Sequence, residues 1–154
     1  MYRTYCDKIP QQLEDITDSF CNKPRGGLWG CRDNAWKKWC EAEQYNLRCL
    51  KKVFYWKLAE NVKLYTIRTE QDYLYLVEKY GNTRQDSIDY MLMKQDYDAI
   101  EVVGDIVYEL RYGTQSTGRR FIDLIGLYAW DVPSICVMNT DKVIRTGNNI
   151  KERN

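Results

Sequence analysis

The chain is organised around Lys23-Pro24-Arg25-Gly26-Gly27-Leu28-Trp29-Gly30-Cys31-Arg32, which Asn34-Ala35-Trp36-Lys37-Lys38-Trp39-Cys40 follows one residue later. Residues 23–40 contain three glycines, three tryptophans and two cysteines. The Gly-Gly pair allows backbone conformations that other residues rarely adopt, and the tryptophans offer flat surfaces for stacking. The stretch therefore predicts either the wall of a pocket for a planar ligand or an aromatic corner of the core.

The composition is that of one globular domain. Of the 154 residues, 44% are hydrophobic and 29% are charged, which is ordinary for a chain that buries a core. Lysine and arginine number 23 against 22 aspartates and glutamates, so the net charge gives no general attraction to nucleic acid or to an anionic membrane. We expect one domain over residues 1–144 and a polar tail over residues 145–154.

Several kinds of chemistry are excluded by residue type. The chain has no histidine, so Ser-His-Asp and Cys-His nucleophilic schemes are impossible. Gaps of eight residues separate Cys31, Cys40 and Cys49, and this spacing does not match the usual zinc sites. We therefore expect no metal, and acid–base chemistry would fall to Asp, Glu, Tyr, Lys or Cys.

The sequence also lacks the usual signals for membranes and export. The first residues have no apolar core of a signal peptide, and no apolar run approaches the ~18 residues of a membrane span. These features predict a cytoplasmic protein that does not bind membranes and keeps its cysteines reduced.

Hydrophobic periodicity predicts short strands and helices that do not strictly alternate. The predicted strands cover residues 1–6, 28–30, 97–103, 106–112 and 134–138, and residues 50–59 and 62–69 are predicted to pair as a hairpin. The predicted helices cover residues 33–44, 69–79 and a segment capped by Asp86 or Ser87, while residues 11–20 form a weak helix or an ordered loop. The class is α+β, with a mixed, mostly antiparallel curved sheet and about three helices on one side. Trp39 is expected in the core, and the place of Trp36 stays open.

Three segments could carry chemistry. They are Arg3-Thr4-Tyr5 on the first strand, the glycine–tryptophan stretch, and an acidic strand end with Glu101 and Asp105. Each has an ordinary alternative: an exposed cation, a turn that needs glycine, or a solvated or capping carboxylate.

The order of these segments carries a family resemblance. Gly-Gly-Leu-Trp-Gly leads into a tryptophan-containing helix, and later come Tyr97-Asp98-Ala99-Ile100-Glu101-Val102 and Trp130-Asp131-Val132-Pro133-Ser134-Ile135-Cys136-Val137-Met138-Asn139. Together with the polar first strand, this order resembles small phage and bacterial ADP-ribosyltransferase-like proteins, a family that includes phage anti-CRISPR enzymes. The resemblance implies a split sheet around a cleft that takes NAD as a substrate, without a metal. It also implies a host protein as the target, with nucleic acid as a further possibility, in the cytoplasm of the host cell.

The resemblance assigns roles to particular residues. Arg3, Thr4 or Tyr5 would contact the ribose or carboxamide of the nicotinamide nucleoside. Gly27, Leu28 and Trp29 would back the nicotinamide, and Trp36 would stack over it. A carboxylate near the late strands would polarise the ribose 2′-hydroxyl, with Glu101 and Asp105 as first candidates and Asp131 behind them. Breaking the nicotinamide–ribose bond builds positive charge on the ribose, which a fixed carboxylate stabilises.

The first strand departs from one family pattern. One subgroup has a histidine there, which this chain lacks, whereas an arginine-type subgroup has an arginine that Arg3 could match. Two other hypotheses therefore stay open. One is a catalytically inactive binding module on the same fold, which inhibits a host defence protein or holds a nucleotide-derived ligand. The other is an interaction protein whose tryptophans belong to the core.

Overall fold

The computed structural model describes residues 1–82, 84, 87–111 and 126–146. In this part of the chain the α+β class is confirmed, with four α-helices and mostly antiparallel open sheets. The helices are α1 (Ala35–Glu43), α2 (Glu70–Tyr80), α3 (Tyr90–Met93) and α4 (Ile106–Glu109). Two short 3-10 helices are η1 (Leu47–Lys51) and η2 (Thr140–Lys142).

Two main sheets carry the fold. The three-stranded sheet has β5 (Lys52–Leu58) between β1 (Tyr2–Cys6) and β11 (Val143–Thr146), all antiparallel. The four-stranded sheet has the order β4 (Leu28–Gly30), β10 (Ser134–Val137), β9 (Ala99–Val102) and β6 (Leu64–Ile67), and its one parallel pair is β6 with β9. Two ribbons complete the strands: β2 (Ile16–Phe20) with β3 (Lys23–Gly26), and β7 (Gly81–Asn82) with β8 (Ser87–Ile88).

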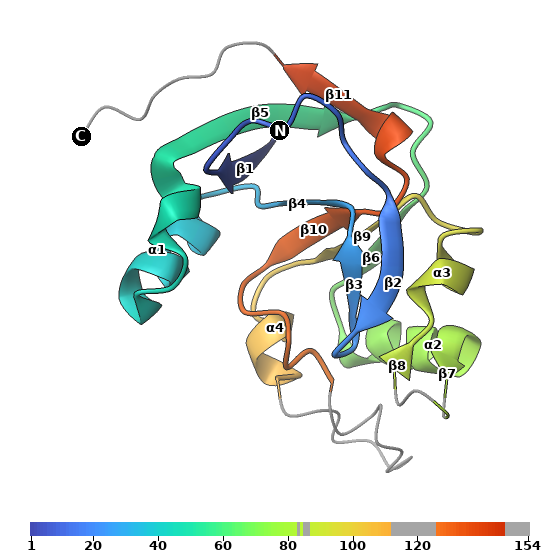
Figure 1. The fold of residues 1–154 in the computed structure, drawn as a ribbon. Helices are drawn as coiled ribbons and strands as arrows, with labels where there is room; N and C mark the ends of the chain where they lie inside the picture. Colours follow the sequence, from blue (N-terminus) through green and yellow to red (C-terminus); the bar gives the residue numbers. More distant parts are fainter. Residues whose placement is uncertain (83, 85–86, 112–125, 147–154) are drawn as a thin grey trace.

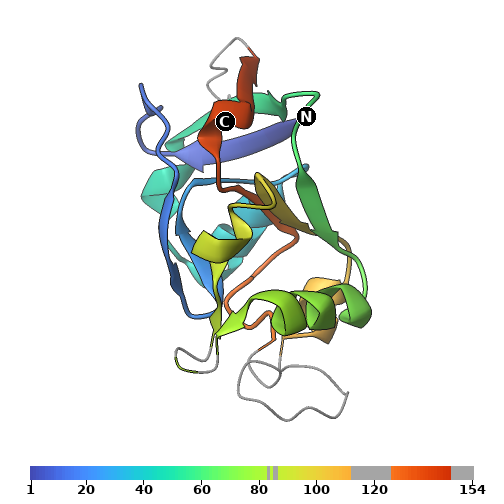
Figure 2. The same cartoon turned by 90° about the vertical axis from the view of Figure 1, so that its right-hand side faces the viewer.

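The sheets and helices are arranged in a clear order. Figure 1 shows the three-stranded sheet at one end of the molecule, the four-stranded sheet in the middle, and α2 with α3 towards the other end. The view turned by 90° keeps this order (Figure 2). The four-stranded sheet is therefore enclosed between the other sheet and α2.

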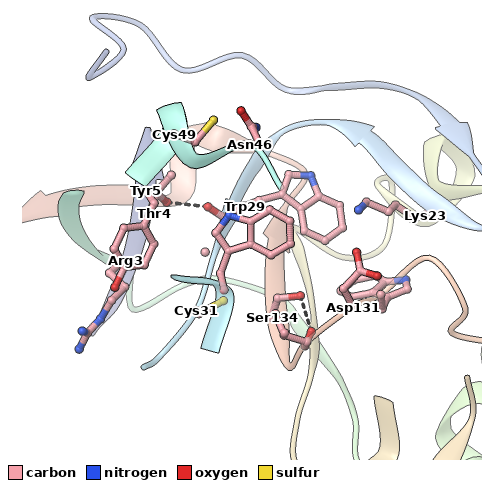
Figure 3. A pocket seen from close by; sticks show the side chains of 14 residues that line it. Arg3, Thr4, Tyr5, Lys23, Trp29, Cys31, Asn46, Cys49, Asp131 and Ser134 are labelled. Carbon is pink, nitrogen blue, oxygen red and sulfur yellow. Dashed lines mark hydrogen bonds between the residues drawn. The ribbon is translucent and has the colours of Figure 1, made fainter. Parts of the chain in front are cut away.

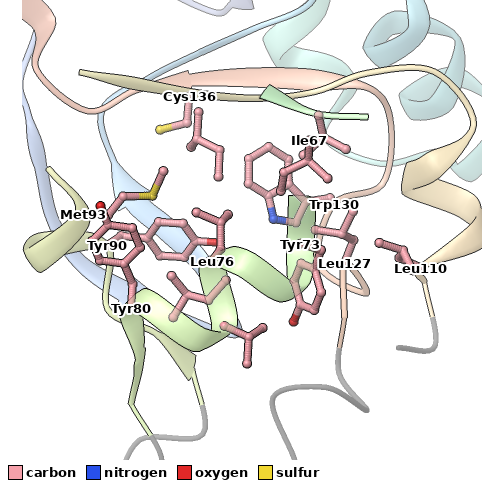
Figure 4. Packing of buried hydrophobic residues seen from close by; sticks show 14 of the residues in the cluster. Ile67, Tyr73, Leu76, Tyr80, Tyr90, Met93, Leu110, Leu127, Trp130 and Cys136 are labelled. Carbon is pink, nitrogen blue, oxygen red and sulfur yellow. The ribbon is translucent and has the colours of Figure 1, made fainter. Parts of the chain in front are cut away.

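Two apolar clusters fill the spaces between these layers. The cluster between the sheets takes residues from both of them: Tyr2, Leu28, Phe54, Trp56, Ala99, Ile135 and Val137. The larger cluster lies between the four-stranded sheet and α2, where Tyr73, Leu76 and Tyr80 meet Ile67 and Trp130 (Figure 4). Burial of these side chains holds the layers together, at about 1.5–3 kcal/mol for each large apolar side chain.

Helix α2 confirms its prediction at both ends. Thr69 is its N-cap: the Thr69 hydroxyl accepts from the Asp72 backbone N–H, and an Asp72 carboxylate oxygen accepts from the Thr69 N–H. This reciprocal capping box satisfies two N–H groups that the helix leaves unpaired. Gly81 follows as the C-cap, with an extended rather than a left-handed backbone.

Two predictions based on local pattern are wrong. Residues 50–59 and 62–69 do not form a hairpin, because β5 pairs with β1 and β11 whereas β6 pairs with β9. Residues 16–20, predicted as part of a weak helix or loop, form β2 and pair with β3.

The helical predictions need three corrections. Residues 106–112 were expected as a strand, but α4 begins at Ile106 and buries Ile106 and Val107. The third predicted helix starts later than expected: α3 has Asp89 as its N-cap, and Ser87 belongs to β8. Trp39, which was expected in the core, is only half-buried. Cys40 is the one residue of α1 that is fully buried.

The last described strand crosses the predicted domain end at residue 144. Strand β11 continues to Thr146, which pairs with Tyr55, so the sheet extends past the expected end at residue 144. The rest of the predicted tail, residues 147–154, lies outside the described residues.

Candidate functional site

A backbone bridge joins the two sheets where β1 meets the end of β4. The Arg3 N–H donates to the Cys31 carbonyl at 2.9 Å, and the Cys31 N–H donates to the Arg3 carbonyl at 3.0 Å. Beside this bridge lies a pocket of about 260 Å³. The described residues that line it are Arg3, Thr4, Tyr5, Lys23, Trp29, Gly30, Cys31, Trp36, Asn46, Cys49, Trp130, Asp131, Val132 and Ser134 (Figure 3).

The hydroxyl of Thr4 joins the two sheets next to the pocket. Its Oγ1 donates to the Trp29 carbonyl at 2.6 Å and accepts from the Trp56 indole N–H at 2.9 Å. Because its one proton is already used, Thr4 positions β1 against β4 rather than offering a donor to a ligand.

Three tryptophans give the pocket its aromatic character. The rings of Trp29 and Trp130 lie 4.9 Å apart at an angle of 59°, and Trp130 is fully buried. The Trp29 indole N–H donates to the Gly26 carbonyl at 3.0 Å, which fixes the orientation of the ring. Trp36 comes from the first turn of α1 and stacks on Trp39, with 5.1 Å between the rings. These rings can hold a planar group by stacking.

The glycines of the central stretch set the path of the backbone. Gly27 has a φ of +69°, and a Cβ at this position would lie 2.6 Å from the Val137 carbonyl oxygen. Gly27 therefore packs against β10 and does not line the pocket. A Cβ on Gly30 would lie 2.6 Å from the Trp56 ring, so only glycine lets β4 approach the first sheet this closely.

Asp131 is the one carboxylate among the described residues of the pocket. Its side chain is 23% exposed and lies 4.0 Å from the Arg111 guanidinium. Burial raises its pKa, while the positive charges of Lys23 and Arg111 partly oppose this rise. A carboxylate with a raised pKa and positive neighbours is typical of functional sites, although structural ion pairs also produce it.

Cations lie at both ends of the pocket. Figure 3 shows Arg3 at one end, with its guanidinium directed away from the tryptophan rings, and Lys23 and Asp131 at the other end. The Arg3 guanidinium is 5.6 Å from the Tyr55 ring centre. The Lys23 ammonium lies 4.7 Å from the Trp29 ring centre and donates to the Ala129 carbonyl at 3.3 Å. The site can thus receive a ligand that combines a flat ring with negative charge.

The structure places the predicted site residues in two groups. The residues that line the pocket are Arg3, Thr4, Tyr5, Trp29, Trp36 and Asp131. The residues that lie elsewhere are Gly27, Leu28, Glu101 and Asp105. Leu28 belongs to the cluster between the sheets, where its side chain packs rather than binds.

Glu101 and Asp105, the first candidates for catalysis, have other surroundings. Glu101 is 4% exposed and accepts two hydrogen bonds from Arg32, at 2.7 and 2.9 Å. Asp105 is exposed at the N-cap of α4, and its side chain makes no capping hydrogen bond.

Lys23, Cys31 and Ser134 line the pocket but were not predicted. Lys23 and Cys31 lie on either side of the predicted Gly27–Trp29 wall in the sequence. This closeness in sequence is the signal that could have identified them as pocket residues. Burial raises the pKa of the Cys31 thiol to about 11, so this cysteine stays protonated at neutral pH and is a poor nucleophile. The Ser134 hydroxyl donates to the Val132 carbonyl at 3.0 Å, which orients it at the start of β10.

Membrane-spanning helices and clusters of metal ligands are both absent from the described residues. None of the helices there combines the length and apolar character needed to cross a bilayer. The same residues contain no group of three or more cysteine, aspartate or glutamate side chains that could hold a metal ion.

Comparison of the chain with models of protein families, with curated proteins and with solved structures finds no match.

Proposed function

We propose that the pocket binds the nicotinamide end of NAD and that the protein is an ADP-ribosyltransferase of the phage or mobile-element type. The observation that carries this proposal is the composition of the pocket. Residues predicted from the resemblance in four separate segments, namely the first strand, Trp29, Trp36 and Asp131, line one cavity. The acceptor would be a host macromolecule, with a protein as the first candidate and nucleic acid as the second.

The fold supports the same proposal. The family resemblance implies a split sheet around the NAD cleft, and this chain has two sheets that a backbone bridge joins beside the pocket. The cavity of about 260 Å³ is slightly below the range of about 300–1,000 Å³ for ligand sites. It would therefore enclose one end of a dinucleotide and leave the rest to a neighbouring surface.

Asp131 takes the role of the carboxylate beside the ribose. Positive charge develops on the ribose as its bond to nicotinamide breaks, and a fixed negative charge in a partly buried site lowers that barrier. A positively charged nicotinamide ring also favours the ionised form of Asp131, which burial disfavours in the free protein. Trp29 and Trp36 would orient the ring, and Arg3 would contact the polar groups of the nucleoside.

The test compares Asp131→Asn with the matched control Asp105→Asn. Asp105 is exposed and outside the pocket, so its variant should match the wild type. We expect Asp131→Asn to reduce nicotinamide release and transfer of labelled ADP-ribose to lysate macromolecules by about a hundredfold, as for loss of one preorganised electrostatic group. Its affinity for NAD, measured by calorimetry, should stay within a few fold. Failure of the wild-type protein to bind NAD at millimolar concentration would refute the proposal.

A binding module without catalysis is the second candidate. Two ion pairs favour it, because each gives a candidate catalytic carboxylate a partner within the protein. Glu101 is buried against Arg32, and Asp131 lies beside Arg111. Such a module would inhibit a host defence protein or hold a nucleotide-derived ligand. NAD binding with no nicotinamide release in any lysate would select this function over the transferase.

A further inference from the structure

A second cavity adjoins the pocket on the side of Lys23. It has a volume of about 330 Å³ and is formed mainly by the ribbon of β2 and β3. Lys23 and Trp29 line both cavities, so the two cavities adjoin at these side chains. Since Figure 3 shows Lys23 at the end of the pocket opposite Arg3, the second cavity extends the site from that end. We call it the ribbon groove; its other described residues include Phe20, Arg25 and Ala129.

The charges of the ribbon groove favour an anion. Lys23 and Arg25 line it, and no carboxylate is found among its described residues. Asp18 faces Arg25 across the ribbon, but its carboxylate accepts from the Ser19 N–H at 2.7 Å and forms no ion pair with Arg25. Two cations on one short ribbon suit a diphosphate, which accepts hydrogen bonds from both ammonium and guanidinium groups.

The outer part of the ribbon groove offers a flat apolar surface. The Phe20 side chain is 63% exposed, which is unusual for a large aromatic residue, and the Arg25 guanidinium lies 5.7 Å from its ring centre. An exposed aromatic ring beside an arginine is a common platform for a nucleic-acid base, and stacking of one base contributes about 1–3 kcal/mol.

The sequence of groups along the whole site therefore matches a dinucleotide. From one end to the other it offers a tryptophan-lined pocket, a carboxylate, a lysine, an arginine and an exposed phenylalanine. We infer that the ribbon groove binds the distal half of the dinucleotide, with Lys23 and Arg25 on the diphosphate and Phe20 under the second base. This inference rests on the proposed function, because it assumes that the nicotinamide end occupies the first pocket.

Calorimetry with three probes tests the inference: NAD, ADP as its distal half, and nicotinamide riboside as its proximal half. The variants are Phe20→Ala and Arg25→Gln, both on the surface, and the control is Arg68→Gln, an exposed arginine on neither cavity. We expect both variants to weaken ADP and NAD binding about tenfold and to leave nicotinamide riboside binding unchanged. The control should bind all three probes as the wild type does.

The outcomes separate the two proposals. If NAD and nicotinamide riboside bind but neither variant weakens ADP or NAD binding, the ribbon groove assignment is wrong and the proposed function stands. If ADP binds through Phe20 and Arg25 but nicotinamide riboside does not bind, the groove assignment stands and the first pocket has been assigned wrongly. If no probe binds, both are wrong.

Discussion

At the scale of single residues, three carboxylates of similar chemistry have three different roles because of their neighbours. Glu101 is buried, and both of its carboxylate oxygens accept hydrogen bonds from Arg32. Asp105 is exposed, and Asp131 faces a partly buried pocket. A catalytic carboxylate must be accessible to a ligand and yet shielded enough for its charge to act strongly. Asp131 alone of the three combines these properties.

The raised pKa of Asp131 has a consequence for stability. Burial makes the folded protein hold this proton more tightly than the unfolded chain, despite Lys23 and Arg111. The protonated group therefore stabilises the fold below the unfolded pKa of about 3.9, and this contribution is lost as the pH rises through the higher folded pKa.

Asp131→Asn should remove this pH dependence. We expect the melting temperature of the variant to exceed that of the wild type at pH 7, with the difference shrinking as the pH falls towards 4. Thermal denaturation followed by circular dichroism across this range measures it. A difference that is independent of pH, or that grows on acidification, would contradict a raised pKa and with it the view of Asp131 as a functional group held at a cost in stability.

At the scale of elements, the Glu101–Arg32–Tyr2 cluster connects the two sheets. Glu101 lies on β9, Tyr2 on β1, and Arg32 follows β4. Arg32 donates to the Tyr2 hydroxyl at 2.6 Å as well as to both oxygens of Glu101. Burial, followed by the nearby Glu101 charge, raises the pKa of Tyr2 to about 12, so its hydroxyl stays protonated at neutral pH. The cluster therefore supports the position of β1 beside the pocket.

Glu101→Gln should weaken the fold and spare the ligand. The glutamine turns an N–H group towards an Arg32 donor, and loss of a hydrogen bond to a charged group costs about 1.5–3 kcal/mol. Because the Arg32 side chain is 59% exposed, we expect the lower end of this range. Urea denaturation gives the change in unfolding free energy, and Glu109→Gln, on the exposed side of α4, is the control. Unchanged stability together with lost NAD turnover would show instead that Glu101 is catalytic.

At the scale of the whole molecule, the pocket lies where two sheets are joined by few backbone hydrogen bonds. A ligand there would touch β1 of one sheet and Trp29 of the other, and so would hold the sheets together. Ligand at one hundred times its dissociation constant stabilises a protein by about 2.7 kcal/mol.

Hydrogen exchange should detect this effect at the bridge between the sheets. We expect saturating NAD to slow exchange of the Arg3 and Cys31 amides more than that of the Met93 amide, which bonds to the Asp89 carbonyl in α3, an element that does not line the pocket. Mass spectrometry or NMR can follow these amides. Equal slowing at all three positions would indicate only global stabilisation and would count against a ligand that bridges the sheets.

Local patterns in the sequence predicted the elements that depend on near neighbours. Helix α2 has an apolar face at helical spacing, and β9 and β10 are short apolar runs, so all three were predicted. The hairpin over residues 50–69 failed because β5 and β6 each pair with a distant strand. Local alternation indicates a strand but carries no information about its partner.

The sequence alone determined which residue types are present to form a site. The absence of histidine means that no histidine of these 154 residues can act as a catalytic base, and the glycine–tryptophan stretch indicates an aromatic wall. Only the tertiary structure decided which carboxylate enters the pocket. Arg32 neutralises Glu101 across 69 positions of sequence, and Asp131 reaches the pocket because β10 lies between β4 and β9. Such a charge pair forms only between strands that become neighbours in the sheet. Which strands become neighbours depends on the packing of side chains far apart in the sequence rather than on local sequence.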